Sequence, residues 1–247
     1  MPAEKTRLDN LVVARGLAPD LAAACAEIMA DNILVDERGN NKPGMMVPAT
    51  AVLRRRREPE PYVSRGGRKL AGALAATGVS VAGCRALDAG ASTGGFTDCL
   101  LQHGSAAVTA LDVGRGLLAH KLRIDPRVTV VENCNIRALA PGELGEPFDL
   151  VVADLSFISL RKVLPALAAQ ARAGGQLLLL VKPQFEAPRG QVAKGGVVRD
   201  DDVRRAAATA VAEAAPACGL AVAGVHESVL PGARGNREYF LHCRKPA

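Results

Sequence analysis

The sequence predicts an α/β protein in two parts: a small α+β unit, followed by a mostly parallel seven-stranded sheet with helices on both faces. From residue 66 onward, short apolar runs alternate with segments of helical period, as in chains whose parallel strands are joined by helices. A glycine-rich turn at residues 88–96 directly follows the first of these apolar runs. A proline-rich stretch at residues 58–62 separates this region from a shorter segment with its own apolar pattern.

The second part begins with a helix and ends with two strands. Helices are predicted at residues 66–77, 94–103, 159–171 and 200–218, the last with Asp200 as its N-cap. Strands are predicted at residues 85–88, 107–112, 128–131, 148–154, 176–182, 220–229 and 237–244. Because the last two strands follow each other closely, they are expected to form a terminal antiparallel hairpin. The whole pattern indicates a Rossmann-like sheet.

The N-terminal segment is predicted to be a compact unit of two helices and two short strands over residues 6–53. Apolar residues recur with helical period in two runs, which Gly16 and Pro19 separate. Strand-like pieces follow at residues 32–36 and 45–47. The expected organisation is therefore an N-terminal domain at 1–58, an interdomain linker at 59–65 and a larger domain at 66–247.

Composition argues against several classes of protein. Aromatic residues are only 3% of the chain and Trp is absent, which disfavours a carbohydrate-binding surface or a platform for stacking many bases. The apolar run at residues 176–181 is far shorter than the ~20 residues of a transmembrane helix. The six cysteines are scattered without a Cys-x-x-Cys pair, which disfavours disulfides and zinc. We expect a cytoplasmic monomer that binds neither a metal nor a membrane.

The positive charge is concentrated in one stretch of the chain. The net charge is +6, and residues 53–69 hold seven basic and two acidic side chains, a net of +5. Residues 1–52 carry a net of −2. A basic cluster of this kind favours an anionic partner such as RNA, although it is also compatible with a solvated tether.

The glycine-rich turn is the predicted cofactor site. Ligands of open α/β sheets bind at the carboxyl ends of the strands, and the first strand–helix turn is the usual place. Gly90, Gly94 and Gly95 allow close approach of a ligand to the backbone. Asp112 ends the next strand, where a carboxylate can accept hydrogen bonds from ribose hydroxyls. A tight turn without a ligand would use the same glycines.

Two details favour S-adenosylmethionine over a nicotinamide dinucleotide. Asp88 precedes the first glycine, where it can face an ammonium group, and the spacing is Asp-x-Gly-x-x-x-Gly-Gly. Asn135 follows the third strand and is predicted either to contact the adenine or to cap its own turn. The predicted cofactor-binding residues are Asp88, Gly90, Ser92, Thr93, Gly94, Gly95, Phe96, Asp112, Asn135 and Asp154.

Four charged residues fall where such a sheet would bring them together. Lys69 lies in the first helix of the second part, and Asp154, Lys182 and Glu238 lie at strand ends. A hydroxyl needs a base to become a nucleophile near pH 7. A lysine can act as that base when burial and a neighbouring cation lower its pKa. Lys182, followed by Pro183, is the predicted base, Asp154 is expected to orient it, and unrelated surface charges are the alternative.

The N-terminal segment resembles the αL RNA-binding module found in a small-subunit ribosomal protein and in many pseudouridine synthases. It departs from that module at 20–21, where Ser-Arg is frequent, and at 36–37, where Asn-Gly is common. The matching pieces are Arg7-Leu-Asp9, Leu11, Gly16, Ala24, Ile28, Ile33-x-Val35 and Lys42-Pro-Gly44. The residues predicted to bind RNA are Arg7, Arg15, Lys42, Arg54, Arg55, Arg56, Arg57, Arg65 and Arg68.

Nearly the whole chain resembles the TlyA family, the hemolysin-like rRNA 2′-O-methyltransferases. The pieces that carry this resemblance are residues 62–70, 88–96, 153–157, 181–186 and 194–199. The resemblance implies an FtsJ-like catalytic domain, S-adenosylmethionine as cofactor, and methylation of cytidine ribose in 16S and 23S rRNA within ribosomal subunits. It also implies that Lys69, Asp154, Lys182 and Glu238 form a catalytic tetrad.

Three other interpretations remain open at this point. The chain could be a nicotinamide oxidoreductase, which would leave the N-terminal segment unexplained. It could be an RNA-binding or ribosome-assembly protein that catalyses nothing. The hemolysin name also suggests a membrane-lytic protein, but the sequence contains no amphipathic lytic helix.

Overall fold

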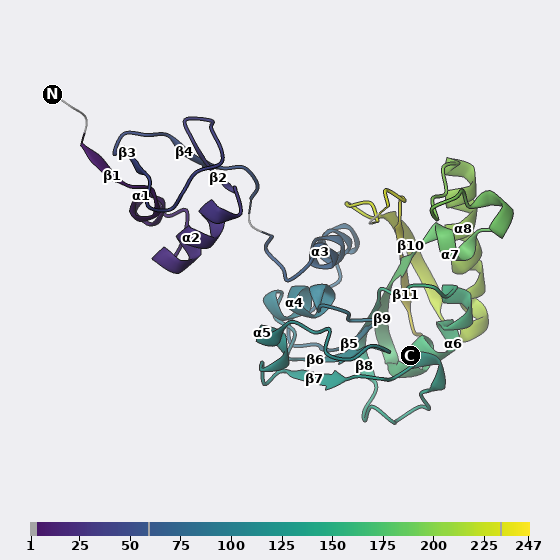
Figure 1. Ribbon diagram of the computed structural model, residues 1–247. Coiled ribbons are helices and arrows are strands. Elements are labelled where there is room, and N and C mark those ends of the chain that lie inside the picture. The colour runs from purple at the N-terminus through teal and green to yellow at the C-terminus, as the bar shows by residue number, and fades with distance from the viewer. Residues whose placement is uncertain (1–3, 59, 233) are drawn as a thin grey trace. The chain divides into compact units, whose positions relative to one another are not determined.

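The computed structural model describes residues 4–58, 60–232 and 234–247. The chain divides into two compact units, Met1–Pro59 and Glu60–Ala247 (Figure 1). Residues 60–64, expected in a linker, belong to the second unit. There Val63 N donates to Asp98 Oδ2 over 2.8 Å, and Gln102 Nε2 donates to Pro61 O over 2.9 Å.

The second unit is built on one seven-stranded sheet with the order β10-β11-β9-β8-β5-β6-β7. Strands β5 to β9 pair in parallel, and β11 pairs antiparallel with both β9 and β10. The predicted parallel sheet with a terminal antiparallel hairpin is therefore confirmed. The strands are β5 (Arg85–Ala89), β6 (Ala107–Leu111), β7 (Val128–Val131), β8 (Phe148–Ala153), β9 (Ala171–Val181), β10 (Ala221–Glu227) and β11 (Tyr239–Arg244).

Helices cover both faces of this sheet (Figure 1). The helices are α3 (Arg65–Thr77), α4 (Gly95–Gln102), α5 (His120–Arg123), α6 (Leu164–Gln170), α7 (Pro183–Glu186) and α8 (Asp201–Ala214). One core cluster packs α3 and α4 against the sheet through Leu70, Leu100 and Phe240. A second cluster packs α6 and α8 against the other face through Leu167 and Val211. Burial of these side chains, at about 25 cal/mol per Å² of apolar area, holds the layers together.

Strand register brings the predicted site residues to one edge of the sheet. Ala89 pairs with Ala153, so the turn after β5 lies beside Asp154. Val181 at the end of β9 pairs with Tyr239 at the start of β11, because these two strands are antiparallel. Lys182 and Glu238 are the next residues outward on their strands, and they therefore meet at the same edge.

The predicted helix at 159–171 is wrong at both ends. A 3-10 turn at Leu160–Lys162 precedes α6, which begins at Leu164 and has Pro165 in its first turn. Proline lacks a backbone N–H, so it is favoured in the first turn of a helix and disfavoured farther inside. Strand β9 already begins at Ala171, and its pairing with β8 shifts register before Gln176. Asp200 is the N-cap of α8, as predicted, and its Oδ1 accepts from Asp202 N over 2.8 Å.

Among its described residues, the first unit contains two helices, as predicted, and four short strands where two were expected. Its elements are β1 (Lys5–Arg7), α1 (Leu8–Ala14), α2 (Leu21–Met29), β2 (Ile33–Val35), β3 (Met46–Pro48) and β4 (Leu53–Arg55). The two expected strands do not pair with each other: β3 pairs with β1, and β2 pairs with β4. The start of the basic run thus lies in a strand of this unit and not in a linker. Leu8, Ile28 and Ile33 are fully or almost fully buried at its centre.

Candidate active site

The turn between β5 and α4 is shaped by its glycines. Gly90 has a φ of +85°, and a Cβ added there would lie 2.8 Å from the Asp154 carbonyl oxygen. Gly94 has a φ of +95°, and a Cβ there would lie 2.3 Å from Leu122. A side chain at either position would be strained by its backbone conformation and would also collide with a neighbour. The glycines therefore let the turn pack closely on both sides.

An apolar cavity of about 390 Å³ lies next to this turn. At its polar end, the Asp112 carboxylate accepts from Ser92 N over 2.8 Å and from Gly114 N over 2.7 Å. These two bonds fix the carboxylate in place and leave acceptor capacity on both oxygens. The remaining wall is mostly apolar and includes Leu111, Val113, Leu117, Ile136, Leu155, Phe157, Ile158 and Val163.

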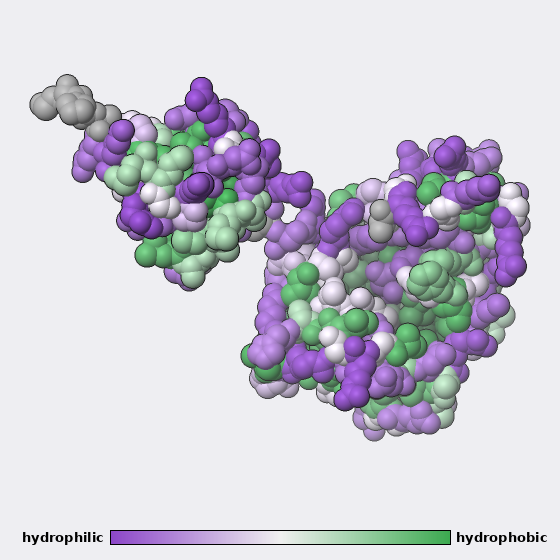
Figure 2. All heavy atoms as spheres, viewed as in Figure 1, coloured by the Kyte–Doolittle hydropathy of each residue, from purple (hydrophilic) through white to green (hydrophobic). Residues whose placement is uncertain are grey.

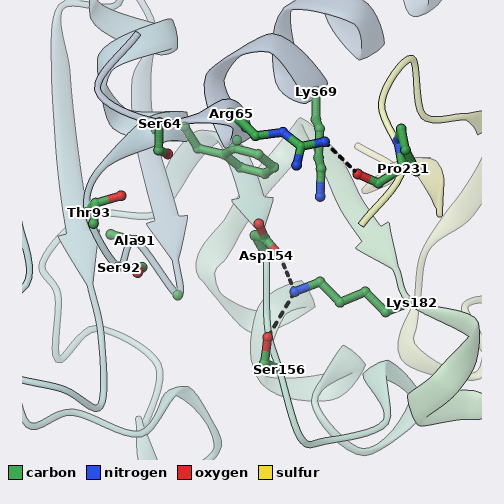
Figure 3. Close-up of a pocket in the computed structure, with 14 residues that line it drawn as sticks. Ser64, Arg65, Lys69, Ala91, Ser92, Thr93, Asp154, Ser156, Lys182 and Pro231 are labelled. Carbon is green, nitrogen blue, oxygen red and sulfur yellow. Dashed lines mark hydrogen bonds and ion pairs between the residues drawn. The ribbon is translucent and has the colours of Figure 1, made fainter. Parts of the chain in front are cut away.

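A second, more polar cavity of about 250 Å³ adjoins the first (Figure 3). The two cavities share Gly90, Ser92, Asp154 and Ser156 as lining residues, so a ligand in one can reach the other. The second cavity is also lined by Ser64, Arg65, Lys69, Thr93, Gly95, Phe96, Lys182 and Pro231. Eight of the predicted catalytic and cofactor residues, from Lys69 to Lys182, thus line this second cavity.

Lys182 lies where the two cavities meet. Its Nζ is 2.5 Å from Asp154 Oδ1 and donates to Ser156 Oγ over 2.9 Å (Figure 3). The side chains of Lys182 and Asp154 are 12% and 24% exposed, so this ion pair remains open to the cavity. A ligand atom can therefore reach the amine directly.

Lys69 forms a second ion pair, with Glu238. The Lys69 Nζ lies 2.6 Å from Glu238 Oε2. Their side chains are 10% and 3% exposed, so this pair is more enclosed than the first. A Cβ added at Gly232 would lie 2.3 Å from Glu238 Oε1, which shows how tightly the preceding loop covers the carboxylate. The structure therefore brings all four predicted catalytic residues to one edge of the sheet, as two distinct pairs.

Asp88 and Asn135 are placed differently from the other predicted cofactor residues. Asp88 is fully buried behind the turn, and its Oδ2 accepts from Thr97 N and Thr97 Oγ1. Burial raises the pKa of Asp88 to about 7, and the charges of Asp154 and Asp112 add to this shift. Asn135 lines the apolar cavity and also accepts from Arg137 N over 3.1 Å. Both roles considered for Asn135 are thus compatible with its position.

The arginines predicted to bind RNA in the first unit are mostly engaged within that unit. Arg54 is paired with Glu37, and Arg56 is paired with Asp31 over 2.7 Å. Arg55 donates to Leu17 O. Within the described residues, Lys42 and Arg57 are exposed and have no such partner. Also in the first unit, Arg7 binds Asp9, and Arg15 donates to Ala49 O. In the second unit, Arg68 pairs with Glu60, and Arg65 donates to Pro231 O.

Three residues of the site were not predicted from the sequence. Ser156 holds Lys182, and Glu186 holds the loop that carries Ser156. The Glu186 carboxylate accepts from Ser159 Oγ over 2.6 Å and from Leu160 N over 2.5 Å, and it is buried. Phe157 has a φ of +64° and is 92% exposed at the cavity wall. An acidic residue directly after a buried strand and helix start was the only signal for Glu186.

Comparison with known proteins assigns the chain to a family. The sequence pattern of the FtsJ-like methyltransferases matches residues 62–245. The chain is also 49% identical to the 16S/23S rRNA (cytidine-2′-O)-methyltransferase TlyA of Mycobacterium tuberculosis, over 98% of this chain and 91% of that protein. This protein belongs to the TlyA family of FtsJ-like methyltransferases. It is an enzyme, and the resemblance seen in the sequence is confirmed.

Solved structures agree with this assignment. A hemolysin candidate from Streptococcus thermophilus is 39% identical, with a TM-score of 0.75, over 98% of this chain and 89% of that one. An S-adenosylmethionine-dependent methyltransferase from Mesorhizobium loti is 18% identical, with a TM-score of 0.52, over 70% and 96% of the two chains, and this likeness shows the fold alone. In the described residues of this chain, no helix has both the length and the apolar character needed to cross a bilayer.

Proposed function

We propose that this TlyA-family protein transfers a methyl group from S-adenosylmethionine to the 2′-hydroxyl of cytidine ribose in 16S and 23S rRNA. The observation that carries the proposal is the Lys182–Asp154 pair, which lies at the junction of the two cavities. An amine in that place can meet a hydroxyl in the polar cavity and a methyl donor in the apolar one.

The apolar cavity fits the adenosine part of S-adenosylmethionine. Asp112 would accept hydrogen bonds from the ribose hydroxyls, and Asn135 would meet the adenine edge. The glycine turn would leave room for the methionine part near Ser92 and Thr93, because Gly90 lines both cavities and carries no side chain. S-adenosylmethionine supplies an electrophilic methyl group on a positively charged sulfur.

Lys182 is the proposed general base. As a neutral amine, Lys182 would take the proton of the ribose 2′-hydroxyl through its Nζ, while the oxygen accepts the methyl group that S-adenosylmethionine would supply, leaving S-adenosylhomocysteine. Asp154 and Ser156 hold the amine in place, and Asp154 stabilises the ammonium that results. Proton transfer to a positioned base typically contributes 10²–10⁴-fold to a rate. Lys69 lines the polar cavity and, held by Glu238, would help to position the substrate ribose.

The nature of the substrate is supported by the relatives and by the first unit. The M. tuberculosis relative is named for cytidine 2′-O-methylation of 16S and 23S rRNA. The first unit, whose sequence resembles the αL RNA-binding module, has an apolar core to which both of its helices contribute. The net charge of +6 also favours an anionic substrate.

The decisive test is transfer of tritiated methyl from S-adenosylmethionine to ribosomal subunits that lack the modification, followed by mapping of the modified ribose. We expect label on cytidine 2′-oxygens in both subunits. Label on a base nitrogen or carbon would contradict the proposal. If S-adenosylhomocysteine raises the melting temperature but no label is transferred, a binding or assembly role would be favoured. If only NAD raises it, an oxidoreductase would be favoured.

A further inference from the structure

Two loops beside the polar cavity carry exposed basic residues that the proposed mechanism does not use. Residues 187–199, between α7 and α8, contain Arg189, Lys194 and Arg199 and no acidic residue. Residues 228–238, between β10 and β11, contain Arg234. All four side chains are exposed. We call these four residues the basic rim. In Figure 2, hydrophilic side chains are frequent along the upper margin of the second unit.

Asn236 joins the two loops. Its Oδ1 accepts from Val198 N over 2.9 Å, and its Nδ2 donates to Gly196 O over 2.7 Å. Asn236 is 2% exposed, and the Arg234 guanidinium adds a further bond to Gly195 O. A buried amide with both of its ends bonded fixes the relative position of two segments, because leaving either end without a partner is costly.

Lys194 lies at the tip of a tight hairpin. Ala193 and Val197 form a β-bridge, and Gly195 and Gly196 between them have φ values of +94° and +78°. Two successive left-handed residues favour glycine, since other side chains rarely adopt this conformation. The hairpin therefore presents Lys194 to solvent on a defined backbone.

The rim is continuous with the active site. Pro231, in the same loop as Arg234, lines the polar cavity, and its carbonyl accepts from Arg65 Nη2 over 3.2 Å (Figure 3). Glu238, two residues after Asn236, is the partner of Lys69. A polymer whose ribose reaches Lys182 must therefore pass next to these loops.

The rim charges lack acidic partners. In the part of the chain that the structure describes, no carboxylate lies within 4.0 Å of Arg189, Lys194, Arg199 or Arg234. Arg54 and Arg56 of the first unit, in contrast, are both paired. Unpaired cations near a catalytic cavity attract anionic substrates and are free to contact phosphates.

We propose that the basic rim binds phosphates of the RNA strand on either side of the methylated nucleotide, with Lys194 and Arg234 as the main contacts and Asn236 as a positioning residue. The inference rests on the proposed function, since it takes RNA as the substrate. It adds a phosphate-binding surface in the catalytic unit to the RNA-binding segment expected in the first unit.

Charge reversal tests the rim without disturbing the core. The variant Lys194→Glu/Arg234→Glu should raise the KM for ribosomal subunits at least tenfold, while kcat at saturating subunits stays within about twofold. Each lost phosphate contact should reduce the slope of log K against log[salt] by roughly 0.7 for a single strand. Affinity for S-adenosylhomocysteine should not change, because neither residue lines the apolar cavity.

The single variant Lys194→Glu is measured beside the double variant, and Arg244→Glu is its matched control. Arg244 is exposed at the other end of β11, where it pairs with Gln176, so it changes the net charge equally but lies away from the cavity edge. We expect the control to keep the wild-type KM and salt slope, and Lys194→Arg/Arg234→Lys to keep them as well. An unchanged salt slope in the double glutamate variant would overturn the inference. An effect of Arg244→Glu on KM and salt slope equal to that of Lys194→Glu would overturn it as well. Because binding to rRNA is measured separately, a wild-type enzyme that transfers no methyl would refute the proposed function and leave this test valid.

Discussion

The two lysine–carboxylate pairs of the site differ in how open they are. Lys182 and Asp154 lie 2.5 Å apart with 12% and 24% of their side chains exposed, and Ser156 adds a third polar group. Lys69 and Glu238 lie 2.6 Å apart and are 10% and 3% exposed. The open pair can exchange a proton with a ligand. The enclosed pair mainly satisfies two buried charges, and its loss should affect folding as much as catalysis.

Substitution of the open pair should give the largest effect on activity. In Lys182→Ala we expect kcat to fall by about 10²–10⁴-fold, because the base is lost. Affinity for S-adenosylhomocysteine should stay within a few-fold. Lys182→Arg should lose as much activity as the alanine variant, because a guanidinium keeps its charge and stays protonated. Near wild-type turnover in either folded variant would show that Lys182 is not the base.

Substitution of the enclosed pair should give the largest effect on stability. Lys69→Met leaves the Glu238 carboxylate buried without a counter-ion, which should lower the free energy of unfolding by about 3–5 kcal/mol. The double variant Lys69→Met/Glu238→Gln should recover most of this loss, because it removes both charges. Urea unfolding monitored by circular dichroism measures both effects. Equal stability of the single and double variants would remove the distinction between the two pairs.

Asp88 differs from both pairs because it is a buried carboxyl without a lysine partner. Its pKa is raised to about 7, above the value of a carboxyl in an unfolded chain, so its contribution to stability is present at low pH and is lost as the pH rises through about 7. Asp88→Asn cannot ionise and should melt a few °C above the wild type at pH 8, and less so at pH 5. Cofactor-free melting curves at the two pH values test this. A melting-temperature difference between the variant and the wild type that grows toward low pH would contradict the prediction.

The basic run of the first unit should give the smallest effect. Two of its four arginines are already paired with Glu37 and Asp31. Replacing all four residues 54–57 with Ala should weaken rRNA binding and flatten its salt dependence, but by less per substitution than replacement of the rim residues. Cofactor affinity should be unchanged. Subunit affinities at several salt concentrations decide this, and a larger effect per charge than at the rim would show that these ion pairs open on binding.

Much of the second unit was predictable because its strands are short apolar runs that alternate with segments of helical period. The first unit was harder, since strands of three residues, such as β1 and β4, are too short to show a period. Three of the four candidate catalytic residues could be named from their places at strand ends, and Lys69 from its place in the first helix of the second unit. Which of the two pairs would be open to the cavity could not be predicted from the sequence. Lys69 meets a partner 169 residues away, and the loop around Gly232 encloses that pair.

The position of β11 has a consequence for synthesis of the chain. This strand lies between β9 and β10, so until residues 239–244 have emerged from the ribosome β9 keeps one unpaired edge and β10 has no partner strand. The counter-charge of Lys69 arrives at the same moment, since Glu238 directly precedes the strand. A nascent chain can therefore form the glycine turn and the Asp112 contacts before it holds a complete catalytic edge. During translation, the ability to bind the methyl donor should precede the ability to use it.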